Sequence, residues 1–115
     1  MILETCGNRG IRITTSNGKK FSMQIGYGAY CSNKDMSMML TRELTQKNVS
    51  SPDCEVAIFS KDDEWITHLY FDDISPEDQV KGYVPIEQIL RIIMAEESMT
   101  NLTGDNNETI YNSRK

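Results

Sequence analysis

Apolar and polar residues alternate in two stretches near the start of the chain, residues 11–15 and 21–25. A period of two is typical of β-strands that bury one face. Asn17 and Gly18 stand between these stretches, and this dipeptide favours a type I′ turn, whose two central residues need positive φ. The pattern predicts a β-hairpin in which the apolar residues of both strands share one face.

Glycine-rich segments at residues 6–10 and 26–31 flank this predicted hairpin, and a short apolar stretch at residues 2–5 precedes the first of them. Glycines next to strands often mark bulges or bends in the sheet. Together, the short strand, the hairpin and the two glycine-rich segments predict an antiparallel meander.

The middle of the chain predicts a second hairpin. Residues 55–59 and 65–71 are rich in β-branched and aromatic residues, and a polar turn separates them. Strict alternation in the second stretch would place His68 on a sheet face among large side chains. A short last strand is expected at residues 80–84.

A helix is predicted from Pro85 to about Met99. Proline suits the first helical position because its missing N–H would have no partner there. The apolar residues that follow have the spacing of one helix face, which would pack against the sheet. They are Ile86, Ile89, Leu90, Ile93 and Met94.

Two further segments carry weaker patterns. Residues 35–48 contain Met36, Met39, Leu40 and Leu44 at helical spacing, so they predict either a short helix or a long excursion between strands. Residues 100–115 are polar and have too little apolar surface to offset the entropy lost on ordering, which predicts a flexible tail.

These elements predict an α+β fold. It is an antiparallel β-sheet of about five or six strands with the C-terminal helix packed on one face. Residues 1–99 would form a single domain, which agrees with a chain of 115 residues.

Composition excludes several classes of function. The chain has 12 Lys and Arg against 17 Asp and Glu, a net charge of −5, which argues against nucleic-acid binding because that depends on basic residues at phosphates. No apolar run approaches the ~18–20 residues that span a membrane. Polar and charged residues, among them Glu4 and Arg9, interrupt any apolar stretch that could form an N-terminal secretory signal. We therefore expect no membrane partner and no nucleic-acid partner.

Catalytic and metal sites are not expected. The 3 cysteines are odd in number and widely spaced, which predicts reduced, largely buried thiols in a cytoplasmic protein. His68 is the single histidine, so a Cys–His catalytic pair would need it beside Cys6, Cys31 or Cys54. The carboxylate clusters lack the alternating ligands and glycine of calcium loops. The sequence therefore predicts a protein without enzymatic activity, cofactor or metal.

A candidate ligand site lies in the two glycine-rich segments. Backbone amides in such bends can form anion-binding nests, arginine binds phosphate in a bidentate manner, and tyrosine offers a face for base stacking. These are the parts that a nucleotide site needs. The alternative is that the glycines only permit bulges and the tyrosines pack in the core. The candidate residues are Asn8, Arg9, Arg12, Gln24, Gly26, Tyr27, Gly28 and Tyr30.

The order of these motifs resembles a family of small tailed-phage accessory proteins. The resemblance covers roughly residues 4–98 in patches, chiefly residues 7–10, 26–31, 55–59 and 82–85. It implies a phage product that acts in the cytoplasm of the bacterial host, and it carries no catalytic residues.

Two functions remain open at this point. One is a non-enzymatic binding protein that counters host defence by sequestering a nucleotide second messenger at the candidate ligand site. The other is an inhibitor that acts by protein–protein contact with a host defence protein, through acidic surface and the methionines Met36, Met38 and Met39. A domain this small could also assemble as a homo-oligomer, with a pocket between subunits.

Overall fold

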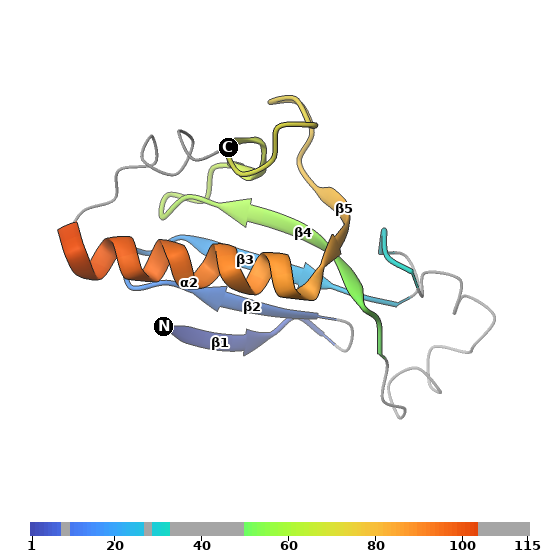
Figure 1. Cartoon of the computed structure of the whole chain (residues 1–115), viewed down its shortest axis with the longest axis horizontal. Coiled ribbons are helices and arrows are strands. Elements are labelled where there is room, and N and C mark those ends of the chain that lie inside the picture. The colour runs from blue at the N-terminus through green and yellow to red at the C-terminus, as the bar shows by residue number, and fades with distance from the viewer. Residues whose placement is uncertain (8–9, 27–28, 33–49, 104–115) are drawn as a thin grey trace.

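The computed structural model describes residues 1–7, 10–26, 29–32 and 50–103. Its described strands form one antiparallel sheet in the order β1-β2-β3-β4-β5, and a long helix, α2, packs on one face (Figure 1). The predicted α+β class is confirmed. The elements are β1 (Ile2–Thr5), β2 (Gly10–Thr14), β3 (Lys20–Gln24), β4 (Asp53–Phe59), the 3-10 helix η2 (Thr67–Leu69), β5 (Lys81–Pro85) and α2 (Ile86–Thr103).

The predicted first hairpin is confirmed as β2 and β3. Ile11 lies opposite Met23, and Ile13 lies opposite Phe21, so the apolar residues share the face that α2 covers. This agreement follows from the local pattern, because slipping the register by one residue would turn every apolar side chain to the other face.

The turn of this hairpin is not the predicted type I′ turn. Gly18 has a φ of 89°, but Asn17 does not adopt a positive φ. The Gly18 N–H donates to the Thr15 carbonyl and the Thr15 N–H donates to the Lys19 carbonyl, both at 2.9 Å, which gives a longer loop with glycine at its left-handed position. The side chain of Asn17 is buried and donates to Glu96 of α2, so a tertiary contact fixes its backbone instead.

The predicted strand at residues 65–71 is wrong. A single bridge joins Phe59 to Trp65, and the chain then forms η2, while β4 pairs with β5. The hydroxyl of Thr67 explains this departure, since it accepts from the Ile58 N–H at 2.9 Å and donates to the Gln79 carbonyl at 2.8 Å. A side chain thus takes the place of a strand partner. His68 consequently belongs to η2 and lies on no sheet face.

The predicted last strand and C-terminal helix are present with shifted bounds. β5 ends at Pro85 and α2 begins at Ile86, so the proline precedes the helix. The helix continues to Thr103, into the segment expected to be a tail. Residues 104–115 and the predicted helix at 35–48 lie outside the described residues.

The buried face of α2 differs from the predicted stripe. Leu90 and Met94 are exposed, whereas Ile92 and Glu96 are buried. The reason is an ion pair between the buried carboxylate of Glu96 and Lys19 on the β2–β3 turn, which turns this side of the helix toward the sheet.

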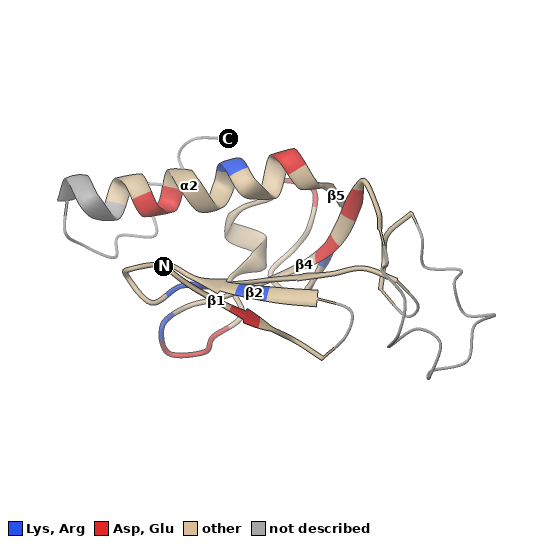
Figure 2. Cartoon of the chain, turned by 90° about the horizontal axis from the view of Figure 1, so that it is seen from below, with Lys and Arg blue, Asp and Glu red and all other residues tan. Residues whose placement is uncertain are grey.

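The core lies between α2 and the face of the sheet that it covers, as Figure 2 shows from the side. The rings of Phe21 and Tyr70 meet edge to face with centroids 5.7 Å apart, which closes the core beside η2. The opposite side of the sheet, here called the open face, carries half-buried side chains such as Arg12, Ser22 and Gln24. Among the fully buried apolar side chains are Phe21, Val56, Ile58 and Ile89.

Candidate functional site

The structure describes four of the eight candidate ligand residues. They are Arg12 and Gln24 on the open face, and Gly26 and Tyr30 beyond the end of β3. Asn8, Arg9, Tyr27 and Gly28 lie outside the described residues.

Arg12 and Gly26 already have partners within the chain. The Arg12 guanidinium forms an ion pair with Glu4 across β1 and β2 at 2.7 Å, and this hydrogen bond raises the arginine pKa. Gly26 has a φ of 92°, and its N–H donates to the sulfur of Cys31 at 3.3 Å. An anionic ligand would therefore compete with Glu4 for the arginine and with a sulfur for the glycine amide.

The amides next to Tyr30 donate to carboxylates of β4. The Tyr30 N–H donates to Glu55 at 3.4 Å, and the Ser32 N–H donates to Asp53 at 2.6 Å. The hydroxyl and amide of Ser32 together lower the pKa of Asp53. Gln24 lies directly opposite Glu55. This end of the sheet consequently presents negative charge, where the nucleotide hypothesis requires a site for an anion.

Tyr30 joins a second tyrosine that the sequence analysis missed. The Tyr83 N–H donates to the Tyr30 carbonyl at 2.9 Å, and a Cβ on Gly82 would stand 2.7 Å from the Tyr30 Cβ. Only glycine permits this close approach. Tyr30 is 54% exposed and Tyr83 is 50% exposed, so packing in the core does not account for Tyr30. We call this pair, Tyr30 and Tyr83, the tyrosine surface.

A sequence signal for Tyr83 was present. Gly82 and Tyr83 repeat the Gly-Tyr dipeptide of the second glycine-rich segment, at residues 26–27. The first occurrence predicts a candidate ligand site and the second the end of a strand, and no local pattern connects the two. The pairing of residues 30 and 83 arises only from the tertiary fold.

The backbone of Tyr83 is in the left-handed region, with φ of 57°. Among the described residues, Asp63 is the other non-glycine residue with a positive φ. Aspartate tolerates this region because its short side chain bonds locally, whereas tyrosine gains no such compensation and the conformation costs about 1–2 kcal/mol. Next to Tyr83, the register between β4 and β5 shifts at Cys54 and Val56. Strain of this kind at an exposed aromatic residue is typical of functional sites.

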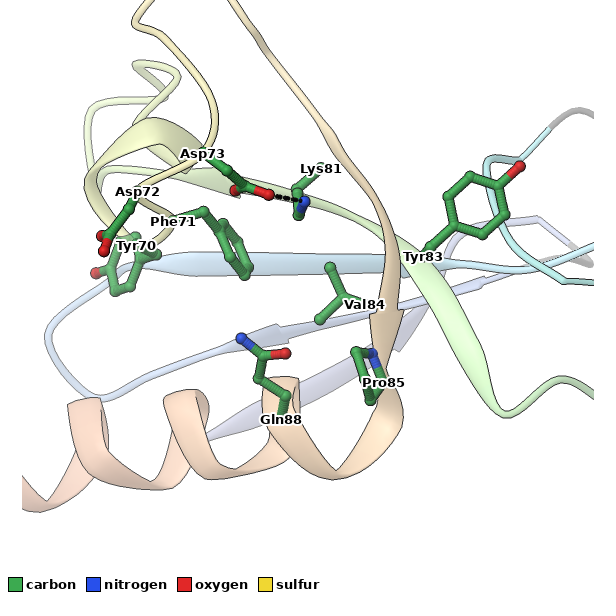
Figure 3. A pocket seen from close by; sticks show the side chains of 9 residues that line it. All are labelled: Tyr70, Phe71, Asp72, Asp73, Lys81, Tyr83, Val84, Pro85 and Gln88. Atoms are coloured by element: carbon green, nitrogen blue, oxygen red, sulfur yellow. Dashed lines mark hydrogen bonds and ion pairs between the residues drawn. The ribbon is translucent and has the colours of Figure 1, made fainter. Parts of the chain in front are cut away.

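A pocket of about 440 Å³ lies on the other side of β5 (Figure 3). The Asp73 carboxylate and the Lys81 ammonium form an ion pair at 2.5 Å on its rim, and the Gln88 side chain points into it from α2. The ring of Tyr83 points away from the other lining side chains, toward residues 29–32. The lining residues are Tyr70, Phe71, Asp72, Asp73, Lys81, Tyr83, Val84, Pro85 and Gln88.

The described residues do not assemble a metal site. No group of three or more His, Cys, Asp or Glu side chains in this part of the chain could hold a metal ion. Burial raises the pKa of the Cys54 thiol to about 12, so it stays protonated and is a poor nucleophile. What the arrangement offers instead is aromatic contact area, acidic groups and a small pocket.

Neither a membrane-spanning helix nor a similarity to known proteins indicates a function for the described part of the chain. Within the described ranges, α2 included, no helix combines the length and apolar character that crossing a membrane requires. Comparison of the chain with protein-family models, curated proteins and solved structures gave no match in any of the three. A function therefore rests on the geometry of the tyrosine surface and the pocket.

Proposed function

We propose that the protein is a non-enzymatic binding protein that acts by contact with a protein partner, through the tyrosine surface. The observation that carries this proposal is Tyr83, whose strained backbone holds a half-exposed ring. If the Tyr83 ring were fully buried, packing in the core could explain the backbone strain, but half of this side chain is exposed to solvent. Tyrosine supplies large and rigid contact area at protein interfaces, where it is enriched among the residues that dominate affinity.

The charge beside the tyrosine surface indicates a basic partner. Asp53 and Glu55 lie on β4 next to Tyr30, and the net charge of the chain is −5. Opposite charges across an interface increase the association rate and exclude like-charged partners. We expect lysine or arginine side chains around the surface that covers the two tyrosines.

The same charges argue against the nucleotide alternative. The amides of Tyr30 and Ser32, which could form an anion nest, donate to carboxylates, and Arg12 is paired with Glu4. A nucleotide phosphate would have to displace these internal partners while approaching like charge. That the partner belongs to a bacterial defence system is implied only by the resemblance to tailed-phage accessory proteins.

Capture experiments with matched variants test the proposal. Tagged wild-type protein, Tyr83→Gly and Asp63→Gly are each incubated with bacterial lysate, and the retained proteins are compared. Tyr83→Gly removes the ring at a position whose backbone favours glycine, so the fold should remain intact. Asp63→Gly also introduces glycine at a position with a left-handed backbone. Asp63 is exposed and belongs to the turn between β4 and Trp65. A protein retained by the wild type and by Asp63→Gly, and lost from Tyr83→Gly, would support the proposal.

Thermal denaturation with a panel of cyclic and linear nucleotides tests the alternative. A ligand that binds only the native state raises the melting temperature by mass action. The proposal predicts no increase for wild-type protein with any nucleotide. Retention of the same proteins by the wild type and both variants, or a nucleotide-dependent increase of the melting temperature, would contradict it.

A further inference from the structure

β1 is an edge strand with an unexplained composition. All four of its residues are exposed, and Ile2 and Leu3, which point to opposite faces, are each 65% exposed. Edge strands of monomeric proteins usually carry lysine, proline or a bulge that prevents pairing with another chain. β1 contains no lysine or proline, and it pairs regularly with β2 along its whole length. Among the described residues, no strand pairs with its outer edge, so a further strand could be added there.

A row of apolar side chains crosses the sheet and ends at β1. Across β4, β3, β2 and β1, on the face that α2 covers, it consists of Ile58, Phe21, Ile13 and Leu3. Ile58 and Phe21 are fully buried, Ile13 is half-buried, and Leu3 is mostly exposed. Burial declines along this row because α2 packs mainly against β4 and β5. An apolar residue on a further strand would continue the row and cover Leu3.

The backbone of β1 defines which residues can pair outward. Hydrogen-bonding groups alternate along an antiparallel strand, and the Cys6 N–H donates to the Gly10 carbonyl of β2. Even-numbered residues therefore bond to β2, and the N–H and C=O groups of Leu3 and Thr5 point away from it. Among the described residues, nothing bonds these outward groups.

We propose that β1 pairs with β1 of a second copy of this chain, antiparallel, about a two-fold axis at Leu3. The two Leu3 residues exchange N–H and C=O bonds, and Ile2 of each copy lies opposite Glu4 of the other. The apolar row then continues from Leu3 of one copy to Leu3 of the next, and the five-stranded sheets join into one. Both α2 helices lie on the same side of the joined sheet, because opposite residues in an antiparallel pair point to the same face.

The low net charge of β1 favours pairing with a second copy, and the pairing register favours a two-fold axis at Leu3. Two copies that each carry a charge of −5 can meet only where carboxylates are few or neutralised. β1 has one charged side chain, Glu4, and Arg12 of the same chain neutralises it. An axis at Glu4 would place two carboxylates opposite each other, and an axis at Ile2 would pair Leu3 with Met1 and so separate the two Leu3 side chains. The axis at Leu3 avoids both outcomes.

Cysteine cross-linking tests the register directly. Ile2→Cys and Glu4→Cys are made separately in a Cys6→Ser background, and Cys31 and Cys54 are buried. With the axis at Leu3, residues 2 and 4 of different copies form a non-hydrogen-bonded pair with Cα atoms about 4.5 Å apart, which suits a disulfide. An equimolar mixture of the two variants should therefore form a covalent dimer under mild oxidation, several-fold faster than either variant alone. Faster cross-linking of Ile2→Cys alone or of Glu4→Cys alone would show a different register and overturn the proposal.

Sedimentation of the unoxidised protein tests the association itself. Wild-type protein should sediment as a dimer at high concentration and dissociate on dilution. Leu3→Lys places two ammonium groups on the axis and should give a monomer at every concentration. Leu90→Lys, at an exposed leucine on α2, is the matched control and should leave the dimer intact. A wild-type monomer throughout, or equal loss of the dimer in both variants, would overturn the proposal.

Discussion

The two ends of the sheet use polar groups in opposite ways. At the β2–β3 turn, a network of buried hydrogen bonds joins the sheet to the C-terminal half of α2. Glu96 accepts from the Lys19 ammonium, the Asn17 amide and the Tyr70 hydroxyl, each at 2.9 Å. Lys19 is 2% exposed and Glu96 is 3% exposed. At this end, every buried polar side-chain atom of the described residues has a partner.

At the other end, Tyr30 and Tyr83 keep half of their side chains in solvent, and the Tyr83 backbone is strained. The two tyrosines contribute little to the core, while the buried network presents nothing to a partner. The first end therefore holds α2 to the sheet, whereas the second end leaves two aromatic side chains in solvent, where the proposed partner would bind. Substitutions should therefore affect stability strongly at one end and weakly at the other.

The largest effect is expected at Lys19. Lys19→Met leaves the buried Glu96 carboxylate without its counter-charge, which should reduce the free energy of unfolding by about 3–5 kcal/mol. Lys20→Met is the matched control, because the Asp63 carboxylate of its ion pair is exposed and water screens its charge, so the loss should be much smaller. Urea denaturation measures both. Equal losses would mean that the buried network does not hold α2 to the sheet.

Thr67 should show the next largest effect. Thr67→Val keeps the shape of the side chain but removes both partners of its hydroxyl, the Ile58 N–H and the Gln79 carbonyl, at a cost of about 1–3 kcal/mol. Thr14→Val, on the open face of β2, is the control and should change stability little. A loss at Thr67 no larger than at Thr14 would contradict the role assigned to this hydroxyl.

Thr67 also shows where prediction from the sequence reached its limit. The hairpin of β2 and β3 was predictable because its pattern is local and its turn residues are adjacent. Residues 65–71 have the composition of a strand, and a single buried hydroxyl redirects them. In the same way, the exposure of Leu90 depends on Glu96 meeting Lys19, which lies 77 residues away in sequence.

The candidate site was predictable in part for the same reason. Tyr30 was identified from its glycine-rich neighbours, but its partner Tyr83 comes from β5 and is brought there by pairing with β4. The Tyr30 amide, which lies in the segment predicted to bind an anion, donates to the Glu55 carboxylate, and the neighbouring Ser32 amide donates to Asp53. Neither contact has a local signal in the sequence.

Backbone strain at Tyr83 should have a smaller effect on stability, and it should make glycine a better substitution than alanine at this position. Tyr83→Ala and Tyr83→Gly both remove the ring, and only glycine relieves the left-handed backbone. We expect the glycine variant to be more stable than the alanine variant by about 1 kcal/mol. At Ser22, an ordinary position of β3, the order should be reversed, because glycine loses more conformational entropy there. Alanine being the more stable at both positions would remove the strain argument, and with it the main support for the tyrosine surface.

The smallest expected effect is on how the free energy of unfolding depends on pH, through Ser16 at the β2–β3 turn and Glu97 on α2. The hydroxyl and the backbone amide of Ser16 both donate to Glu97. These hydrogen bonds lower the pKa of its carboxyl group, and the hydroxyl has the larger effect. A carboxyl group whose pKa is lower in the folded state stabilises the fold at pH values above its unfolded pKa, which is about 4.3. This stabilisation is lost as the pH falls through the pKa of the folded state. Glu97→Gln should therefore be less stable than wild type at neutral pH, and the difference should shrink on acidification below the unfolded value. Ser16→Ala removes the hydroxyl but keeps the backbone amide, so it should reproduce part of the loss, and its effect should be smaller in the Glu97→Gln background than in wild type. Urea denaturation across that pH range measures the three curves, and a stability difference that does not change with pH would show that these hydrogen bonds do not depend on the charge of Glu97.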